Sequence, residues 1–150
     1  MNNQLKISII GVKGYPYVYG GYETFIKEIS ERLIKKNCDV TIYCHKSLFV
    51  NKPKKIKGIN LVYVPSIETK ILSQPIHSFF SIIHACFSEC DIILVVNSSN
   101  GPFGFLTRIF KKTTVINVDG MEWLRPKWKG LGSIYFKWAS KMATLFYDQI

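Results

Sequence analysis

A glycine-rich segment at residues 11–21 (GVKGYPYVYGG) holds the first candidate chemistry of this 150-residue chain. Glycine permits backbone conformations with positive φ and lets a ligand approach the main chain closely. The helix predicted to follow this segment offers unpaired N–H groups and a positive dipole end, and Lys13 adds a formal charge. The segment therefore suits a phosphate group, with Lys13, Gly14, Gly20 and Gly21 as its candidate ligands. The alternative is a loop whose glycines serve only the turn.

Two familiar phosphate-binding loops do not fit this spacing. The segment lacks the G-x-G-x-x-G pattern, and the second predicted strand is followed by His45 and Lys46 where dinucleotide-binding folds carry an acidic residue. This argues against a nicotinamide-dependent dehydrogenase. A G-x-x-x-x-G-K-[ST] run is also missing, which argues against a P-loop nucleotidase.

The elements that must position this loop alternate between strand and helix. Apolar runs predict strands at residues 5–10, 40–44, 59–65, 92–96 and 113–118. Helical spacing predicts helices at residues 22–36, 75–89, 102–110 and 133–147, with a basic loop at 52–58 and a polar loop at 97–101. This order is typical of an α/β fold: a Rossmann-like parallel sheet with helices on both faces.

Ligands of such sheets bind at the carboxyl ends of the strands. Three loops follow strand ends here and are rich in glycine or polar residues: residues 11–21, 97–101 and 119–128. We therefore expect the functional site where these loops meet. The final residues, 148–150, resemble the start of another strand, so we expect the chain to be a fragment of a longer protein.

The chain carries a net charge of +10, from 20 Lys and Arg against 10 Asp and Glu. Such a net positive charge suits a phosphate-bearing ligand or an acidic membrane surface as a partner. The alternative is that the lysines only form a solvated surface. Nucleic acid ranks last, because helix-turn-helix, RNA-binding and zinc signatures are absent. The longest apolar stretch, residues 76–87, is too short and polar to span a bilayer, and no signal peptide is evident. We expect a cytoplasmic protein.

Cysteine and histidine residues give no sign of a metal site. The four cysteines form no C-x-x-C pair, and although Cys86 and Cys90 are spaced to share a helix face, no further ligands complete a site. Buried free thiols are the expected state, and no metal is predicted. His45, His77 and His84 are isolated in the sequence, and we assign them no chemistry.

Two longer motifs carry a resemblance to a known family. The run G-x-x-G-Y-P-x-x-Y-G-G-Y-E-T-F at residues 11–25 resembles the opening of family 4 glycosyltransferases, in particular their rhamnosyltransferase-like subgroup. The run NVDGMEWLRPKW at residues 117–128 is similar to the second signature of that subgroup. With the strand pattern between the two motifs, the resemblance covers essentially the whole chain.

The resemblance implies a GT-B fold, of which residues 1–150 would be the N-terminal, acceptor-side domain. A C-terminal, donor-binding domain would be absent from this chain, which would be inactive alone. The implied reaction is retaining transfer of a sugar, rhamnose from dTDP-rhamnose as the first expectation, to a polysaccharide or lipid-linked saccharide. The implied enzyme needs no cofactor or metal, and the basic surface suggests peripheral contact with the inner face of the cytoplasmic membrane. The rival interpretation is a non-catalytic Rossmann-like module that binds a sugar or a phosphate.

The resemblance also suggests residue roles. Gly20 and Gly21 match glycines that pack close to the donor diphosphate. Asp119 stands where many relatives place a histidine that meets the donor sugar's 6-hydroxyl, which is consistent with a 6-deoxy sugar; the alternative is a capping aspartate in a turn. Asp119 is thus the first catalytic candidate, and Glu122 is a weaker one, as a base at the acceptor hydroxyl.

The candidate acceptor-binding residues come from all three loops. Aromatic rings stack on sugars, and a lipid pyrophosphate would need cations, although core packing and a solvated surface are the competing explanations. Glu23 either has a structural role in the first helical turn or bonds a sugar hydroxyl. The full set is Tyr15, Tyr19, Glu23, Asn97, Trp123, Arg125 and Lys127.

Overall fold

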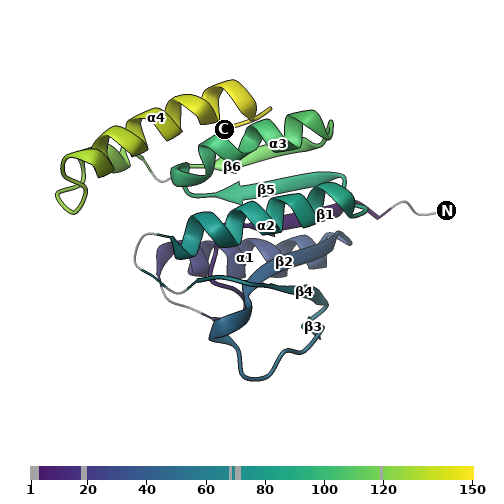
Figure 1. The fold of residues 1–150 in the computed structure, drawn as a ribbon. Helices are drawn as coiled ribbons and strands as arrows, with labels where there is room; N and C mark the ends of the chain where they lie inside the picture. The colour runs from purple at the N-terminus through teal and green to yellow at the C-terminus, as the bar shows by residue number, and fades with distance from the viewer. Residues whose placement is uncertain (1–3, 18–19, 68, 70–71, 119) are drawn as a thin grey trace.

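The computed structural model contains a six-stranded sheet with strand order β3-β4-β2-β1-β5-β6 (Figure 1). The structure describes residues 4–17, 20–67, 69, 72–118 and 120–150. The strands are β1 (Lys6–Ile10), β2 (Asp39–His45), β3 (Lys55–Ile56), β4 (Ile59–Val64), β5 (Ile92–Val96) and β6 (Thr113–Asn117). All neighbouring strands pair in parallel except β3, which runs antiparallel to β4 at the edge.

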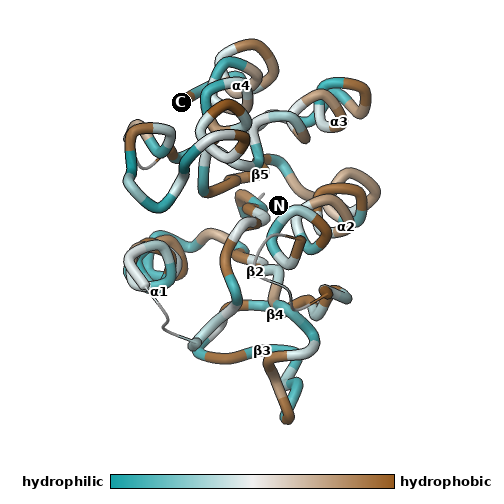
Figure 2. The backbone as a smooth tube through the Cα atoms, turned by 60° about the vertical axis from the view of Figure 1, so that its left-hand side comes forward, coloured by the Kyte–Doolittle hydropathy of each residue, from teal (hydrophilic) through white to brown (hydrophobic). Residues whose placement is uncertain are grey.

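Helices cover both faces of this sheet. Helix α1 (Gly21–Lys35) lies on one face, and α2 (Ser73–Phe87) and α3 (Gly104–Ile109) lie on the other, as Figure 2 shows. Helix α4 (Leu131–Phe146) follows β6, and three short 3₁₀ helices complete the chain: η1 (Lys46–Leu48), η2 (Ser98–Phe103) and η3 (Glu122–Leu124). The α/β, Rossmann-like fold predicted from the sequence is confirmed.

Side-chain alternation along the strands divides the core into two layers. On β1, Ile9 belongs to the layer beneath α1, where it joins Ile26, whereas Ile10 belongs to the layer that contains Ile82 of α2. The central strands are therefore buried on both faces, which explains why they read as continuous apolar runs.

The structure corrects several local predictions. The basic loop at residues 52–58 contains the short strand β3, and the polar loop at 97–101 is mostly the 3₁₀ helix η2. Helix α2 ends at Phe87, so Cys90 does not share a helix face with Cys86. The last helix, α4, packs through Phe136, Ala139 and Ala143, whereas Ile134 and Trp138 are exposed.

Cysteine burial only partly matches the prediction. The cysteines are free, but Cys44 and Cys86 are buried whereas Cys38 and Cys90 are half-buried. Within the part of the chain that the structure describes, no group of three or more His, Cys, Asp or Glu side chains is placed to hold a metal ion. No helix formed by the described residues is long and apolar enough to cross a membrane.

Burial of Cys44 gives a testable consequence for thiol chemistry. Desolvation raises the pKa of the Cys44 thiol to about 11, so its reactive thiolate is scarce at pH 8. Cys38 and Cys90 are more accessible, so we expect them to react first with a thiol reagent under native conditions. Mass spectrometry of the partly labelled protein measures the order. Labelling of Cys44 as fast as Cys38 would contradict the buried position.

Candidate functional site

Strand ends and loops meet at the carboxyl edge of the sheet, and the first contact is between the β1–α1 loop and η2. Gly11, at the end of β1, has φ of 106°, and a Cβ there would lie 2.4 Å from the Val96 carbonyl oxygen and 3.0 Å from Nδ2 of Asn100. The Asn100 side chain in turn donates to the Val96 carbonyl at 2.7 Å. Glycine at position 11 thus lets the first loop pack directly on the β5–η2 connection.

The η2 segment is fixed to α4 by tyrosine hydroxyls. Tyr135 donates to the Ser99 carbonyl at 2.8 Å, and Tyr147 donates to the Asn100 carbonyl at 3.0 Å. Asn97 begins the segment with φ of 76°, and its side-chain oxygen accepts from the Ser99 amide at 2.9 Å. The predicted acceptor residue Asn97 therefore caps η2, a structural role that the sequence did not indicate.

Helix α4 positions the third loop, of which the structure describes residues 120–128. The Ser133 hydroxyl donates to the carbonyl of Trp123 at 2.8 Å, and the Trp128 ring packs on Phe136 with centroids 4.7 Å apart. Trp123 is half-buried. The Lys127 ammonium lies 5.3 Å from the centre of the Trp128 ring, a cation–π contact.

Glu122 is the centre of this third loop. Its side chain is buried, with Oε1 at 2.9 Å from Nε of Arg125 and Oε2 at 3.6 Å from Nζ of Lys127. The Trp128 indole N–H donates to the same Oε2 at 3.0 Å. A carboxylate held by two cations and an indole is poorly placed to accept a substrate proton. This geometry favours an organising role for Glu122 over the catalytic base suggested by the sequence.

Removing the charge of Glu122 therefore has a structural effect. We expect Glu122→Gln to lower the free energy of unfolding by about 1–2 kcal/mol, because charged hydrogen bonds are lost while Arg125 and Lys127 remain partly solvated. Urea denaturation followed by circular dichroism measures the change. The matched control is Glu28→Gln in the exposed Glu28–Arg32 pair of α1, which should change stability by less than about 0.5 kcal/mol. Equal effects of the two substitutions would refute the organising role.

The glycines of the first loop fall into two classes. A Cβ on Gly14 would lie 2.7 Å from the Phe49 ring, and Gly14 has φ of 139°, so this glycine serves packing. At Gly20 the nearest atom to an added Cβ is a Glu23 carboxylate oxygen at 3.6 Å, and at Gly21 no atom lies within 4 Å. Gly20 and Gly21 therefore present open main chain at the amino end of α1.

Glu23 places a carboxylate against the main chain of the first loop. It is largely buried, and its Oε1 accepts from the Lys13 amide at 3.4 Å. The carboxylate thus already sits on a main-chain N–H of the loop, near the amino end of α1 where the helix dipole favours an anion. This placement supports the structural role among the two considered for Glu23.

The predicted tyrosines do not share one position. Tyr15 is buried, and its hydroxyl donates to Oε1 of Glu31 at 2.8 Å, beneath the loop rather than at its mouth. Burial, followed by the Glu31 contact, raises the pKa of Tyr15 to about 12. Tyr19 and Asp119 lie outside the described residues, so their predicted roles stay predictions.

Two histidines that are far apart in sequence meet beside this edge. His45, the last residue of β2, stacks on His77 of α2 with ring centroids 3.8 Å apart and an interplanar angle of 25°. Both side chains are fully buried. Local spacing does not indicate this pairing, because the connection between β2 and α2 includes all of β3 and β4. His84, further along α2, instead bonds the Tyr43 hydroxyl at 2.9 Å.

Comparison with known families places the whole described chain in one group. Residues 4–150 match the family described as a domain of unknown function, DUF1972. The chain belongs to this family. No curated protein matches it. The match covers both motifs identified in the sequence. Gly20, Gly21 and the Glu122 cluster, which consists of Glu122, Arg125, Lys127 and Trp128, therefore lie inside the DUF1972 domain.

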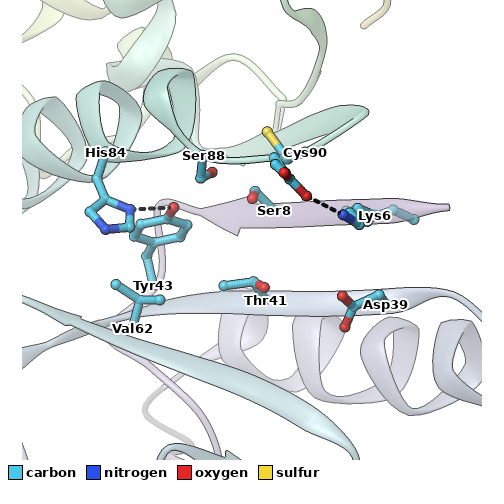
Figure 3. A pocket seen from close by; sticks show the side chains of 11 residues that line it. Lys6, Ser8, Asp39, Thr41, Tyr43, Val62, His84, Ser88 and Cys90 are labelled. Atoms are coloured by element: carbon cyan, nitrogen blue, oxygen red, sulfur yellow. Dashed lines mark hydrogen bonds and ion pairs between the residues drawn. The ribbon is translucent and has the colours of Figure 1, made fainter. Parts of the chain in front are cut away.

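A hollow of this DUF1972 domain lies at the opposite end of the sheet (Figure 3). It measures about 150 Å³ and opens between β1, β2 and the end of α2, with Ser8, Thr41 and Tyr43 on its sheet side. The ion pair between Lys6 and Glu89, at 2.7 Å, closes one side.

Proposed function

We propose that this chain is the acceptor-side domain of a glycosyltransferase that moves a sugar from a nucleotide donor to a saccharide or lipid-linked saccharide. The observation that carries the proposal is the open main chain of Gly20 and Gly21 at the amino end of α1, on the edge of the sheet where ligands bind. Rhamnose from dTDP-rhamnose is the first donor to test, and this choice rests on the resemblance of the two motifs alone.

The first support is the electrostatics of the β1–α1 connection. Gly20, the N-cap of α1, has no side chain that could cover the amino end of the helix. The helix dipole favours a negative group at this end, and bare glycines let a diphosphate approach the main chain. In this proposal the loop stabilises the charge that develops on the leaving diphosphate.

The second support is the third loop, which follows β6 and carries Arg125 and Lys127. Glu122 binds Arg125 and Lys127 and so holds both cations on one short segment. Fixed cations at the carboxyl edge suit the pyrophosphate of a lipid-linked acceptor. The half-buried Trp123 ring beside them offers an apolar surface for a sugar ring.

The third support is the exposed end of α4. Its amino-terminal half projects past the sheet at the carboxyl edge (Figure 1) and carries the exposed apolar side chains Leu131, Ile134 and Trp138. Apolar residues exposed at the mouth of a site suit a surface that faces a second domain. We propose that such a domain forms the other wall of the cleft and binds most of the donor.

The decisive experiment is a donor screen on the full-length protein. The protein is incubated with individual nucleotide sugars and an extract of lipid-linked saccharides, and release of nucleoside diphosphate is measured. The proposal predicts turnover with at least one donor. Turnover with a hexose donor but not dTDP-rhamnose would remove only the rhamnose choice. Binding of a nucleotide sugar without turnover under any condition would instead favour the non-catalytic binding module.

A further inference from the structure

Helix α2 has an inverted amphipathic pattern. The side that faces the sheet buries Ile82 but otherwise carries small or polar residues: His77, Ser78, Ser81, Ala85 and Cys86. The outward side carries bulky apolar residues, including Phe79, Phe80 and Phe87, of which Phe87 is 75% exposed. None of the 15 residues of α2 is Lys, Arg, Asp or Glu. A helix at the surface normally turns its charged side outward, so the outer side of α2 is built to contact something apolar.

Helix α3 extends this surface. Phe110, directly after α3, packs edge-on against Phe87 with ring centroids 4.9 Å apart, which joins the two helices. Figure 2 shows α2 and α3 on the same side of the sheet. We call the combined surface the α2–α3 face; its exposed members are Phe79, Phe80, Phe87, Phe105, Ile109 and Phe110.

The two segments that form the α2–α3 face carry charges of one sign, although Arg108 pairs with Asp148 at 3.8 Å and Glu89, just after α2, pairs with Lys6. Residues 73–87 and 104–112 contain no Asp or Glu, but they contain Arg108, Lys111 and Lys112. Lys112 donates to the Ser88 carbonyl at 2.9 Å, which holds its ammonium at the end of α2 beside Phe87. Aromatic side chains bordered by cations are the combination that binds the interface of a membrane containing anionic lipids.

We propose that the α2–α3 face docks on an anionic lipid membrane, with its phenylalanines inserted among the acyl chains and its cations at the headgroups. A second copy of the chain is the alternative occupant, but each copy carries a net charge of +10, so two copies repel. The same charge attracts an anionic bilayer. An open groove of about 550 Å³ along α2, lined by Phe80, Ile83, His84, Phe87 and Ser88, gives room for part of an acyl chain.

Docking in this orientation leaves the carboxyl edge accessible. Helices α2 and α3 run alongside the strands, so a membrane on their outer side is parallel to the strands rather than across their ends (Figure 1). The β1–α1 loop and the Glu122 cluster would then lie near the headgroups and remain accessible to a ligand. The inference rests on the surface alone and does not require the proposed transferase activity.

Vesicle co-sedimentation of the full chain tests this inference. We expect binding to vesicles of phosphatidylglycerol and phosphatidylethanolamine, weaker binding at high salt, and little binding to phosphatidylcholine alone. Phe87→Ser should weaken binding about tenfold, since one inserted aromatic side chain is lost. Lys111→Gln should weaken it about fivefold.

Matched controls on other surfaces keep the test specific. Val50→Ser removes an apolar side chain that is 96% exposed on the loop before β3, and Lys35→Gln removes a cation from α1 on the other face of the sheet. Both should bind vesicles as the parent chain does. Circular dichroism checks that each variant is folded. Equal losses in test and control variants would overturn the inference, as would a dimer in sedimentation equilibrium that Phe87→Ser converts to monomer.

Discussion

Gly101→Ala is expected to destabilise the fold by about 3 kcal/mol, at the upper end of the usual range for overpacking a core. An added Cβ at Gly101 would lie 2.0 Å from the Ala139 carbonyl oxygen and 3.0 Å from the Ala143 amide nitrogen. Both are backbone atoms of α4, so no side-chain rotation relieves the clash. The helix would have to move away from η2 and strain the Tyr135 and Tyr147 hydrogen bonds.

Urea denaturation monitored by circular dichroism measures this loss. Gly21→Ala is the control, because no atom lies within 4 Å of a Cβ built there. It should change stability by no more than about 1 kcal/mol, the difference between Gly and Ala in a helix. If Gly101→Ala were as stable as the control, the close packing of η2 on α4 would be wrong.

Gly21→Val should reduce the proposed sugar transfer about a hundredfold while the protein stays folded, because small displacements of a reacting group cost that much. No atom of the described residues beyond the neighbouring backbone lies within 4 Å of a Cβ built at this position, so valine would extend into the space proposed for the donor diphosphate. Initial rates of nucleoside diphosphate release, with the donor identified by the screen, measure the loss. Gly21→Ala should give an intermediate rate.

Glu28→Val serves as the control for this second prediction. It places the same β-branched residue in α1 at an exposed position about two turns from Gly21. Its rate should match that of the parent enzyme. A Gly21→Val enzyme with undiminished turnover would show that the diphosphate does not approach this glycine, even if the protein proves to be a transferase.

The fold was predictable because its central strands are short, continuous apolar runs. Residues 92–96, for example, are buried among neighbours on both faces, and such a run has few other possible structures. The strand β3 was missed because two residues in a lysine-rich run after Pro53 form no recognisable pattern. The contact of α4 with η2 was not predictable either, since it combines the close approach of Ala139 and Ala143 to Gly101 with the Tyr135 hydrogen bond.

The site was only partly predictable. The sequence located the three loops, because loop position follows from strand order. It did not show that Gly14 serves the Phe49 ring while Gly21 is open, since this depends on packing with residues far along the chain. The stacking of His45 on His77 likewise depends on tertiary contacts that no local spacing encodes, whereas the partners of Glu122 all lie within six residues of it.

The residues after α4 change the exposed side of β6. The Asp148 carboxylate accepts from the Thr114 amide at 2.8 Å, and the Gln149 carbonyl accepts from the Ile116 amide at 3.0 Å. These bonds occupy N–H groups that an outermost strand otherwise leaves available to another chain, and such unpaired edges promote aggregation. A protein truncated before Asp148 would therefore expose unpaired N–H groups along β6. Its self-association would result from the loss of residues 148–150 rather than from a less stable core.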